Sequence, residues 1–185
     1  MARLPAATRE SVPQDQRDAF DELVKAHGSV PVRGPGSVMI HVPKAHRLLT
    51  ALNRYLRDDS TLPKKLQELA MLVTARELDC QYVWNAHAAS ARASGIADAT
   101  VDALRERAAP PALGDDELAV VRYGQELLRT HRVSRGTFQL AQEQLGARGV
   151  VELGLLLGNY AMLALQVNAH DVDLPPERTE RILPV

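Results

Sequence analysis

The residues best suited to chemistry lie in one short segment, ELAMLVTARELDCQYVWNAH. It contains a carboxylate, an arginine, a thiol, an indole and an imidazole, in Glu68, Arg76, Cys80, Trp84 and His87. A carboxylate and an imidazole that lie close together shift each other's proton affinity, which general acid/base catalysis near neutral pH requires. Glu68 and His87 are therefore the candidate catalytic pair.

Helical periodicity predicts where these side chains point. Cys80, Trp84 and His87 recur at i, i+4 and i+7, so a helix would present them together on one inward face. Glu68 and Arg76 lie at i and i+8 on the preceding predicted helix. Antiparallel pairing of the two helices would bring both groups to the same space, where the planar guanidinium of Arg76 could hold a substrate carboxylate. We predict that Arg76, Cys80 and Trp84 contact the substrate.

Other polar residues are weaker candidates. His41 follows an apolar run that could carry it to the mouth of a pocket, so we also predict that His41 contacts the substrate, with His46 a lesser candidate. Asn159, Gln166 and His170 form a polar seam on the last predicted helix. Such a seam either lines a cavity or hydrogen-bonds to neighbouring backbone, and the second outcome is the more common.

A purely structural interpretation of the candidate pair stands beside the catalytic one. Lys64 and Lys65 precede Glu68 by about one turn, so Glu68 could simply balance charge on a helix surface. His87 lies among alanines and could be a core histidine with a backbone partner. On spacing alone this interpretation is favoured, because ionisable groups are also perturbed in purely structural networks.

Several ligand classes are excluded by the sequence. The histidines have no partner at metal-ligand spacing, so no metal site is predicted. The glycine-rich segment GSVPVRGPGS follows no predicted strand and lacks the Lys-Ser/Thr ending of a phosphate-binding loop. The formal net charge is -1, from 22 basic and 23 acidic residues, which leaves no basic stripe for nucleic acid. We therefore expect a small-molecule substrate.

All the elements that must position these residues are predicted to be helical. The predicted helices span residues 14–27, 43–57, 63–78, 80–94, 98–107, 115–131, 134–146 and 148–171. Thr61 and Ser134 are predicted N-caps, and Gly146 ends the seventh helix. The segment from Gly28 to Gly36 is predicted to be a loop. The chain of 185 residues is expected to form one all-α domain, residues 1–185, with an extended arm over 1–13 and an extended tail over 172–185.

The cellular compartment is predicted from three features. Cys80 is the only cysteine, so no intramolecular disulfide can form. The first residues contain no apolar leader. The longest apolar run begins at Val150 and is interrupted by Glu152 and Asn159, so it is predicted to be a buried helix and not a membrane span. We expect a cytoplasmic protein with no membrane association.

The string LPKKLQELAMLVTARELDCQYVWNAHAASARASGI resembles the signature region of the carboxymuconolactone decarboxylase and alkylhydroperoxidase D superfamily. The flanking residues 14–174 resemble its decarboxylase-like branch. Glu68, Cys80 and His87 fall on the positions of the glutamate, the first cysteine and the histidine of the peroxidase branch. Val83 occupies the position of the second cysteine, so the disulfide cycle of that branch cannot run within one chain.

The resemblance implies an alkylhydroperoxidase D-like helical bundle with about eight helices. It also implies cofactor-independent lyase or isomerase chemistry on a small carboxylated or lactone-type substrate, with Glu68 and His87 as the proton-transfer pair. Homo-oligomers, commonly trimers or hexamers, are typical of the family. Two alternatives remain open: a thiol-dependent peroxidase or redox protein that uses Cys80, and a non-catalytic oligomeric binding protein built on the apolar final helix.

Overall fold

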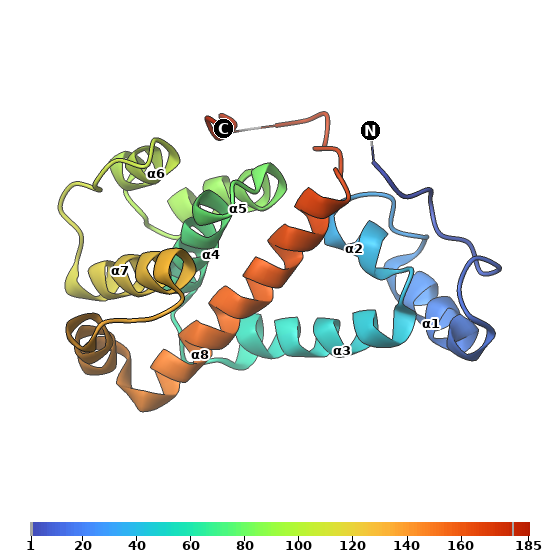
Figure 1. Ribbon diagram of the computed structural model, residues 1–185, viewed down its shortest axis with the longest axis horizontal. Coiled ribbons are helices and arrows are strands. Elements are labelled where there is room, and N and C mark those ends of the chain that lie inside the picture. The colour runs from blue at the N-terminus through green and yellow to red at the C-terminus, as the bar shows by residue number, and fades with distance from the viewer. Residues whose placement is uncertain (1, 179) are drawn as a thin grey trace.

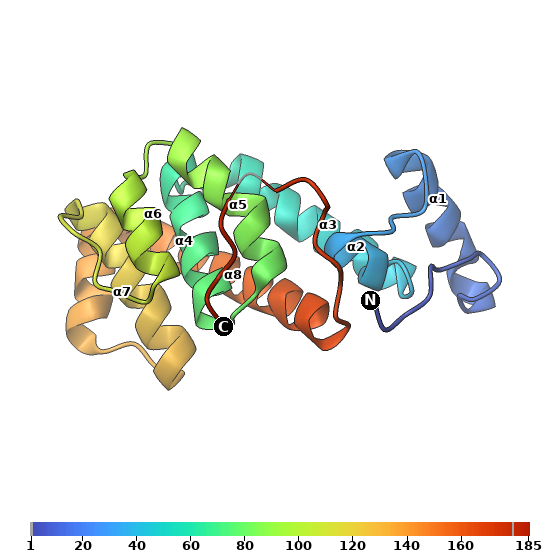
Figure 2. The ribbon, with the colours of Figure 1, turned by 90° about the horizontal axis from the view of Figure 1, so that it is seen from above.

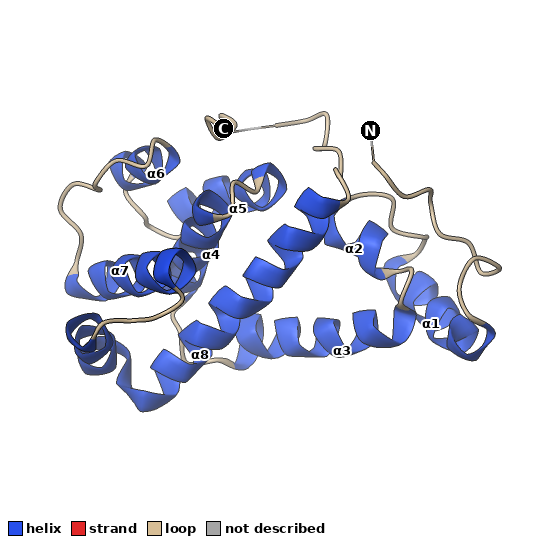
Figure 3. Ribbon diagram, viewed as in Figure 1, coloured by secondary structure: helices blue, strands red, loops and turns tan. Residues whose placement is uncertain are grey.

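The computed structural model describes residues 2–178 and 180–185, and it contains helices and loops with no strand in those ranges (Figure 3). The expected all-α fold is confirmed. In chain order the helices are η1 (Gln14–Gln16), α1 (Arg17–His27), α2 (Gly34–Met39), α3 (Pro43–Arg54), η2 (Tyr55–Asp59), α4 (Lys64–Glu77), α5 (Gln81–Ala93), α6 (Asp98–Arg105), α7 (Asp115–Thr130) and α8 (Arg135–Ala169). η1 is a 3₁₀ turn and η2 is a π-helical turn.

Helix α4 is the centre of the main hydrophobic core. Every residue from Leu66 to Arg76 is buried, because α4 packs against α5, α7 and α8 (Figure 1). A helix covered on several sides needs apolar side chains around most of its circumference, as the LAMLV run at its centre provides. The one carboxylate in the buried part of α4, Glu68, is therefore held in place by the best-packed part of the molecule.

Helix α8 crosses the molecule diagonally (Figure 1) and bends sharply at Gly146. Gly146 has φ +69° and ψ 172°, a conformation that glycine adopts at little cost. The two helices predicted on either side of this residue are thus the two arms of α8. By length and composition α8 is apolar enough to cross a membrane, but half of its most apolar window is buried within the protein. It is a helix of the core.

Helices α1, α2 and α3 form a smaller lobe beside α8 (Figure 1). Ala7 and Val12 of the N-terminal arm pack with Phe20, Leu23 and Ile40 in a second hydrophobic cluster.

The prediction of a loop over residues 28–36 is wrong at its end, because α2 begins at Gly34. Pro35 sets φ for the first turn of the helix. Gly34 has φ +65°, and a Cβ added there would lie 2.6 Å from the hydroxyl of Tyr82.

The C-terminal segment lies across α5 (Figure 2). Leu183 is buried, and its backbone N–H and C=O both hydrogen-bond to the side-chain amide of Gln81, at 2.8 Å each. The indole N–H of Trp84 donates to the carbonyl of Arg181 at 3.1 Å. The predicted tail is therefore a docked strap that covers the outer side of the helix carrying His87.

Candidate functional site

A cavity of about 350 Å³ opens between the small lobe and the core helices α5 and α8. Its wall combines apolar side chains with amide, hydroxyl and imidazole groups. The lining residues are His27, Pro35, Gly36, Met39, His46, Leu49, Thr50, Asn53, Tyr82, Val83, Ala86, His87, Asn159, Tyr160 and Leu163. This size and mixture are typical of a site for a small organic molecule.

Glu68 lies directly behind this wall, with 1% of its side chain exposed. Its Oε2 accepts a hydrogen bond from His87 Nδ1 at 2.8 Å. Its Oε1 lies 3.1 Å from Arg57 Nη2 and 3.1 Å from Lys64 Nζ. Burial raises the pKa of Glu68, but the hydrogen bond from His87 and the charges of Lys64 and Arg57 outweigh this effect and lower it. Glu68 is therefore a carboxylate at neutral pH.

The ionised Glu68 determines the tautomer of His87. Because a carboxylate only accepts hydrogen bonds, the neutral form of His87 carries its proton on Nδ1 and its lone pair on Nε2. His87 borders the cavity, and Nε2 has no hydrogen-bond partner among the described residues. An imidazole held in this way can act as a general base towards a molecule in the cavity, with Glu68 stabilising the imidazolium that forms.

Tyr160 places a hydrogen-bond donor next to this base. Its ring meets His87 edge to face, with centroids 5.2 Å apart. Arg57 Nη1 donates to the Tyr160 hydroxyl at 3.1 Å, so the hydroxyl proton remains available to a ligand. Burial raises the pKa of Tyr160, which keeps the phenol protonated. Arg57 contacts both Glu68 and Tyr160 because it lies on the π-helical turn η2, which follows α3 directly.

Two amides complete the polar wall near this end of the cavity. Asn159 Nδ2 donates to Asn53 Oδ1 at 3.3 Å. The Oδ1 of Asn159 is buried and has no partner among the described side chains and backbone groups. Of the polar seam predicted on the last helix, Asn159 lines the cavity, whereas Gln166 and His170 do not. The imidazole of His170 instead hydrogen-bonds to the carbonyl of Gln166.

Residues 43–126 match the model of the carboxymuconolactone decarboxylase family. Through this segment, which is somewhat less than half of the chain, the protein is similar to that family. The matched segment contains Glu68, Val83 and His87, together with Arg57 and all of α3 to α6.

Solved structures with the same fold extend the likeness beyond the matched segment. An uncharacterized peroxidase-related protein with an alkylhydroperoxidase AhpD core, from Ralstonia eutropha JMP134, superposes with a TM-score of 0.72 at 18% identity, covering 95% of this chain and 93% of that one. A peroxidase-related protein from Silicibacter sp. TM1040 gives 0.68 at 18% identity, with 95% and 92% covered.

A protein of unknown function from Agrobacterium tumefaciens gives a TM-score of 0.63 at 13% identity, with 73% of this chain and 93% of that chain covered. A search of curated proteins found no match. At these identities the structural likeness establishes the fold alone, an AhpD-like arrangement of helices.

Arg76 does not reach the cavity, contrary to prediction. Its guanidinium is buried at the other end of α4, where it pairs with Asp79 at 2.5 Å and donates to the carbonyl of Pro184. The spacing explains the error, because eight residues advance a helix by roughly 12 Å and rotate it by about 80°. Arg76 thus holds the C-terminal strap, and its predicted role in binding substrate is wrong.

Cys80 and Trp84 also lie outside the cavity, in the main core, with 0% and 1% exposed. Cys80 is the N-cap of α5, and Trp84 and Ala88 follow on the side that faces the core. His87 lies at the border between this side and the one that carries Val83 and the cavity. Their predicted contact with substrate is wrong because the predicted helical face is wide: Cys80 and Trp84 lie on its core side, and only His87 reaches the cavity.

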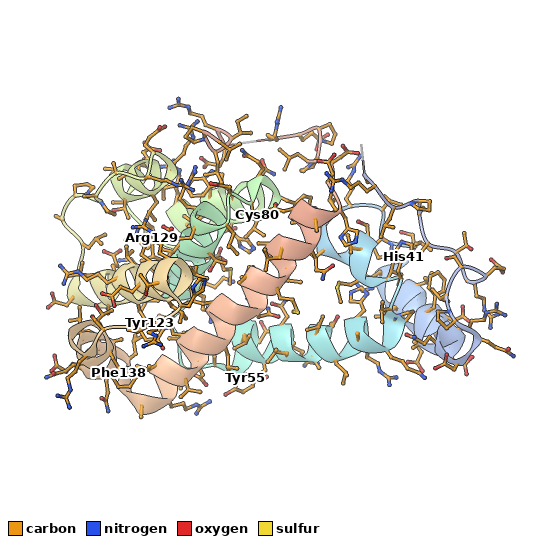
Figure 4. The ribbon with its side chains drawn as sticks, viewed as in Figure 1. His41, Tyr55, Cys80, Tyr123, Arg129 and Phe138 are labelled. Atoms are coloured by element: carbon orange, nitrogen blue, oxygen red, sulfur yellow. The ribbon has the colours of Figure 1, made fainter. Side chains whose placement is uncertain are left out.

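His41 is likewise absent from the cavity wall, whereas His46, the lesser candidate, is part of it. Because residues 34–39 are helical, His41 is turned away from the cavity, and its Nε2 is buried with no partner among the described residues. Figure 4 shows His41 beside α2, on the other side of α8 from Cys80.

Residue spacing on α3 indicates part of the cavity wall that the sequence analysis did not predict. His46, Thr50 and Asn53 recur at i, i+4 and i+7 and form one polar stripe on α3, and this stripe lines the cavity. Arg57, His27 and Tyr160 had no such signal, because their roles depend on contacts between distant helices.

Proposed function

We propose that this protein is a cofactor-independent lyase or isomerase that moves a proton on a small carbonyl- or lactone-containing substrate, with Glu68 and His87 as the catalytic pair. The observation that carries the proposal is the hydrogen bond between Glu68 and His87 Nδ1, which leaves Nε2 available on a ring that borders a cavity of small-molecule size. The match of residues 43–126 to the carboxymuconolactone decarboxylase family supports the lyase class.

Each group has a role in the proposed reaction. His87 Nε2 takes a proton from the carbon next to the carbonyl group, and the electron pair of that C–H bond moves onto the carbonyl oxygen. The Tyr160 hydroxyl donates a hydrogen bond to the oxyanion, and Glu68 pairs with the imidazolium. Return of the proton to another carbon gives an isomer. In a decarboxylation, the C–C bond to the carboxylate breaks first and carbon dioxide leaves. His87, which for this reaction begins with a second proton taken from solvent, then protonates the resulting enolate at carbon.

A thiol peroxidase is less well supported by the same site. Burial raises the pKa of the Cys80 thiol, which disfavours the reactive thiolate. The position that borders the cavity near His87 carries Val83, which has no thiol. Cys80→Ala is therefore expected to leave the proposed activity unchanged.

Proton abstraction can be tested before the substrate is known. The protein is incubated in D₂O with a panel of small lactones and 3-oxo acids, and deuterium incorporation next to the carbonyl group is followed by NMR. Glu68→Gln and His87→Gln are expected to lower the exchange rate by about 10²- to 10⁴-fold. Circular dichroism verifies that both variants are folded. Exchange that is equally fast in the folded variants, or absent from the parent with every compound, would refute the proposal.

A further inference from the structure

The end of the cavity remote from Glu68 carries a second group of imidazoles. His27, the last residue of α1, and His46, in the first turns of α3, face each other with ring centroids 5.8 Å apart. Only 8% of His46 is exposed, and its Nδ1 is buried with no hydrogen-bond partner among the described residues. A buried ring nitrogen without a partner is unfavourable, so a ligand that hydrogen-bonds to this imidazole would be favoured.

This pair is separate from the proposed catalytic end. His46 and Asn53 lie seven residues apart on α3, which corresponds to roughly 10 Å along the helix axis. Asn53 hydrogen-bonds to Asn159, the neighbour of Tyr160, whereas His46 lies beside Gly36 of α2. The wall between the two ends includes the apolar side chains of Met39, Leu49 and Leu163. The cavity therefore has two polar ends joined by an apolar middle.

The charges around the imidazole pair favour an anion. The titratable residues that line the cavity are His27 of α1, His46 of α3, Tyr82 and His87 of α5, and Tyr160 of α8. No lining residue is an aspartate or a glutamate. The cations Lys44 and Arg47 of α3 pair with Asp15 and Glu22, and Arg33 before α2 adds positive charge near Tyr82.

The surroundings disfavour a positive charge on His46 as long as no anion lies beside it. Burial lowers the pKa of His46, and the neighbouring charge of His27 lowers it further. His27 Nδ1 donates a hydrogen bond to the carbonyl of Leu23, so Nε2 is the ring nitrogen left to bond to a ligand. A negative group between the rings would relieve their repulsion and favour the protonated form.

We propose that His27 and His46 bind a carboxylate of the substrate and that the pair takes up a proton from solvent as it does so. The substrate of the site is then a small molecule with a carboxylate at one end and the reacting carbonyl at the other, separated by an apolar or cyclic body. The identification of this ligand as the substrate rests on the function proposed above, but carboxylate binding itself can be measured without turnover.

The test uses benzoate as the anionic probe and benzamide as its neutral isostere. Binding is followed by NMR of the histidine ring signals at about pH 8 and about pH 6, where imidazoles gain their proton. Benzoate is expected to bind about tenfold more tightly at the lower pH and to raise the pKa values of His27 and His46. Benzamide is expected to show no such pH dependence.

Variants separate the two ends of the cavity. His27→Gln and His46→Asn are expected to remove the pH dependence of benzoate binding, whereas His131→Asn, a matched change at an exposed histidine outside the cavity, should retain it. His87→Gln should abolish proton exchange and still bind benzoate with the same pH dependence. Loss of that dependence in His87→Gln but not in the other two would place the carboxylate at the catalytic end and overturn the proposal. Failure of benzoate to shift either ring at the lower pH would also overturn it.

Discussion

Glu68 and Glu152 are both buried carboxylates held by several hydrogen-bond donors, but they differ in their position relative to the cavity. Glu68 is held by His87, Arg57 and Lys64 and has an imidazole between it and the cavity. Glu152 accepts hydrogen bonds from Tyr55, Arg148 and Thr61, and neither it nor these partners line the cavity that His87 borders. Ionised hydrogen-bond networks of this kind therefore do not by themselves mark a reaction centre. Glu68 differs in that its partner His87 lines a cavity in which a substrate could bind.

The hydrogen bonds of Glu152 are expected to make the free energy of unfolding depend on pH. Burial raises the pKa of Glu152, but hydrogen bonds from Thr61, Tyr55 and Arg148 outweigh it and lower the pKa from 4.5 to about 2. Because the folded-state pKa lies below that of the unfolded chain, this carboxylate stabilises the fold above about pH 4.5, and the contribution is lost as the pH falls towards about 2. Glu152→Gln is expected to lower the free energy of unfolding by about 1–3 kcal/mol at neutral pH.

Urea denaturation between about pH 7 and about pH 3 measures this effect. The parent should lose more stability than Glu152→Gln across the acidic part of the range. Parallel pH profiles for the two proteins would contradict the assignment. Glu126→Gln, a change at a half-buried carboxylate that accepts hydrogen bonds from Ser134 and Thr137, serves as the comparison.

At the scale of elements, α5 determines which groups meet. Cys80 is its N-cap and Val83 lies one turn later, so the two Cα atoms are separated by roughly 5.5 Å, a distance that a disulfide can bridge. Val83→Cys is therefore expected to form an intramolecular disulfide with Cys80 under mild oxidation. Thiol titration and mass spectrometry detect the loss of both thiols.

The matched control for this experiment is Ala86→Cys, which also adds a thiol to the cavity wall. Its position, six residues after Cys80 and on another side of α5, prevents bridging within the chain. Two free thiols in oxidised Val83→Cys, or a disulfide in Ala86→Cys, would show that α5 does not begin as described.

Sequence patterns predicted the elements that depend on local signals. Ser134 caps α8, where its side chain accepts a hydrogen bond from the N–H of Thr137, and Gly146 interrupts that helix as expected. Thr61 was predicted to cap α4, but its N–H and hydroxyl bind Glu152, which is 91 residues away. The contact between Glu68 and His87 was predicted from helix pairing. The partners Arg57 and Tyr160 were not, because the register between distant helices has no local signature.

At the scale of the whole molecule, the C-terminal strap joins the ends of α4, α5 and α6. Leu183 is 1% exposed, whereas the adjacent Ile182 is 47% exposed. Leu183→Ala is expected to destabilise the protein by about 2–3 kcal/mol, because it removes a buried side chain and leaves a cavity. Ile182→Ala should cost less than about 0.5 kcal/mol. Thermal and urea denaturation of both variants test this, and equal effects would show that the strap is not docked in solution.

Helix α8 also carries exposed apolar side chains that could contact another copy of the chain. Val151, Leu155 and Leu165 lie along one face of α8 with 63%, 45% and 56% exposed. We propose that this face contacts another copy of the chain, in a trimer or hexamer. Leu155→Glu is expected to reduce the mass measured by light scattering, whereas Val32→Glu, on the loop before α2, should not. A parent that is monomeric at all concentrations would contradict this proposal.

The π-helical turn η2 makes the position of Arg57 depend on the number of residues in that turn. A π turn contains one residue more than the α-helical turn it replaces, so everything before it is rotated by about 100° relative to everything after it. Deleting a single residue there would leave α3 and α4 helical but would swing Arg57 away from Glu68 and Tyr160. A deletion of one codon, at a position that does not line the cavity, would thus be enough to abolish activity in a protein whose helices still fold.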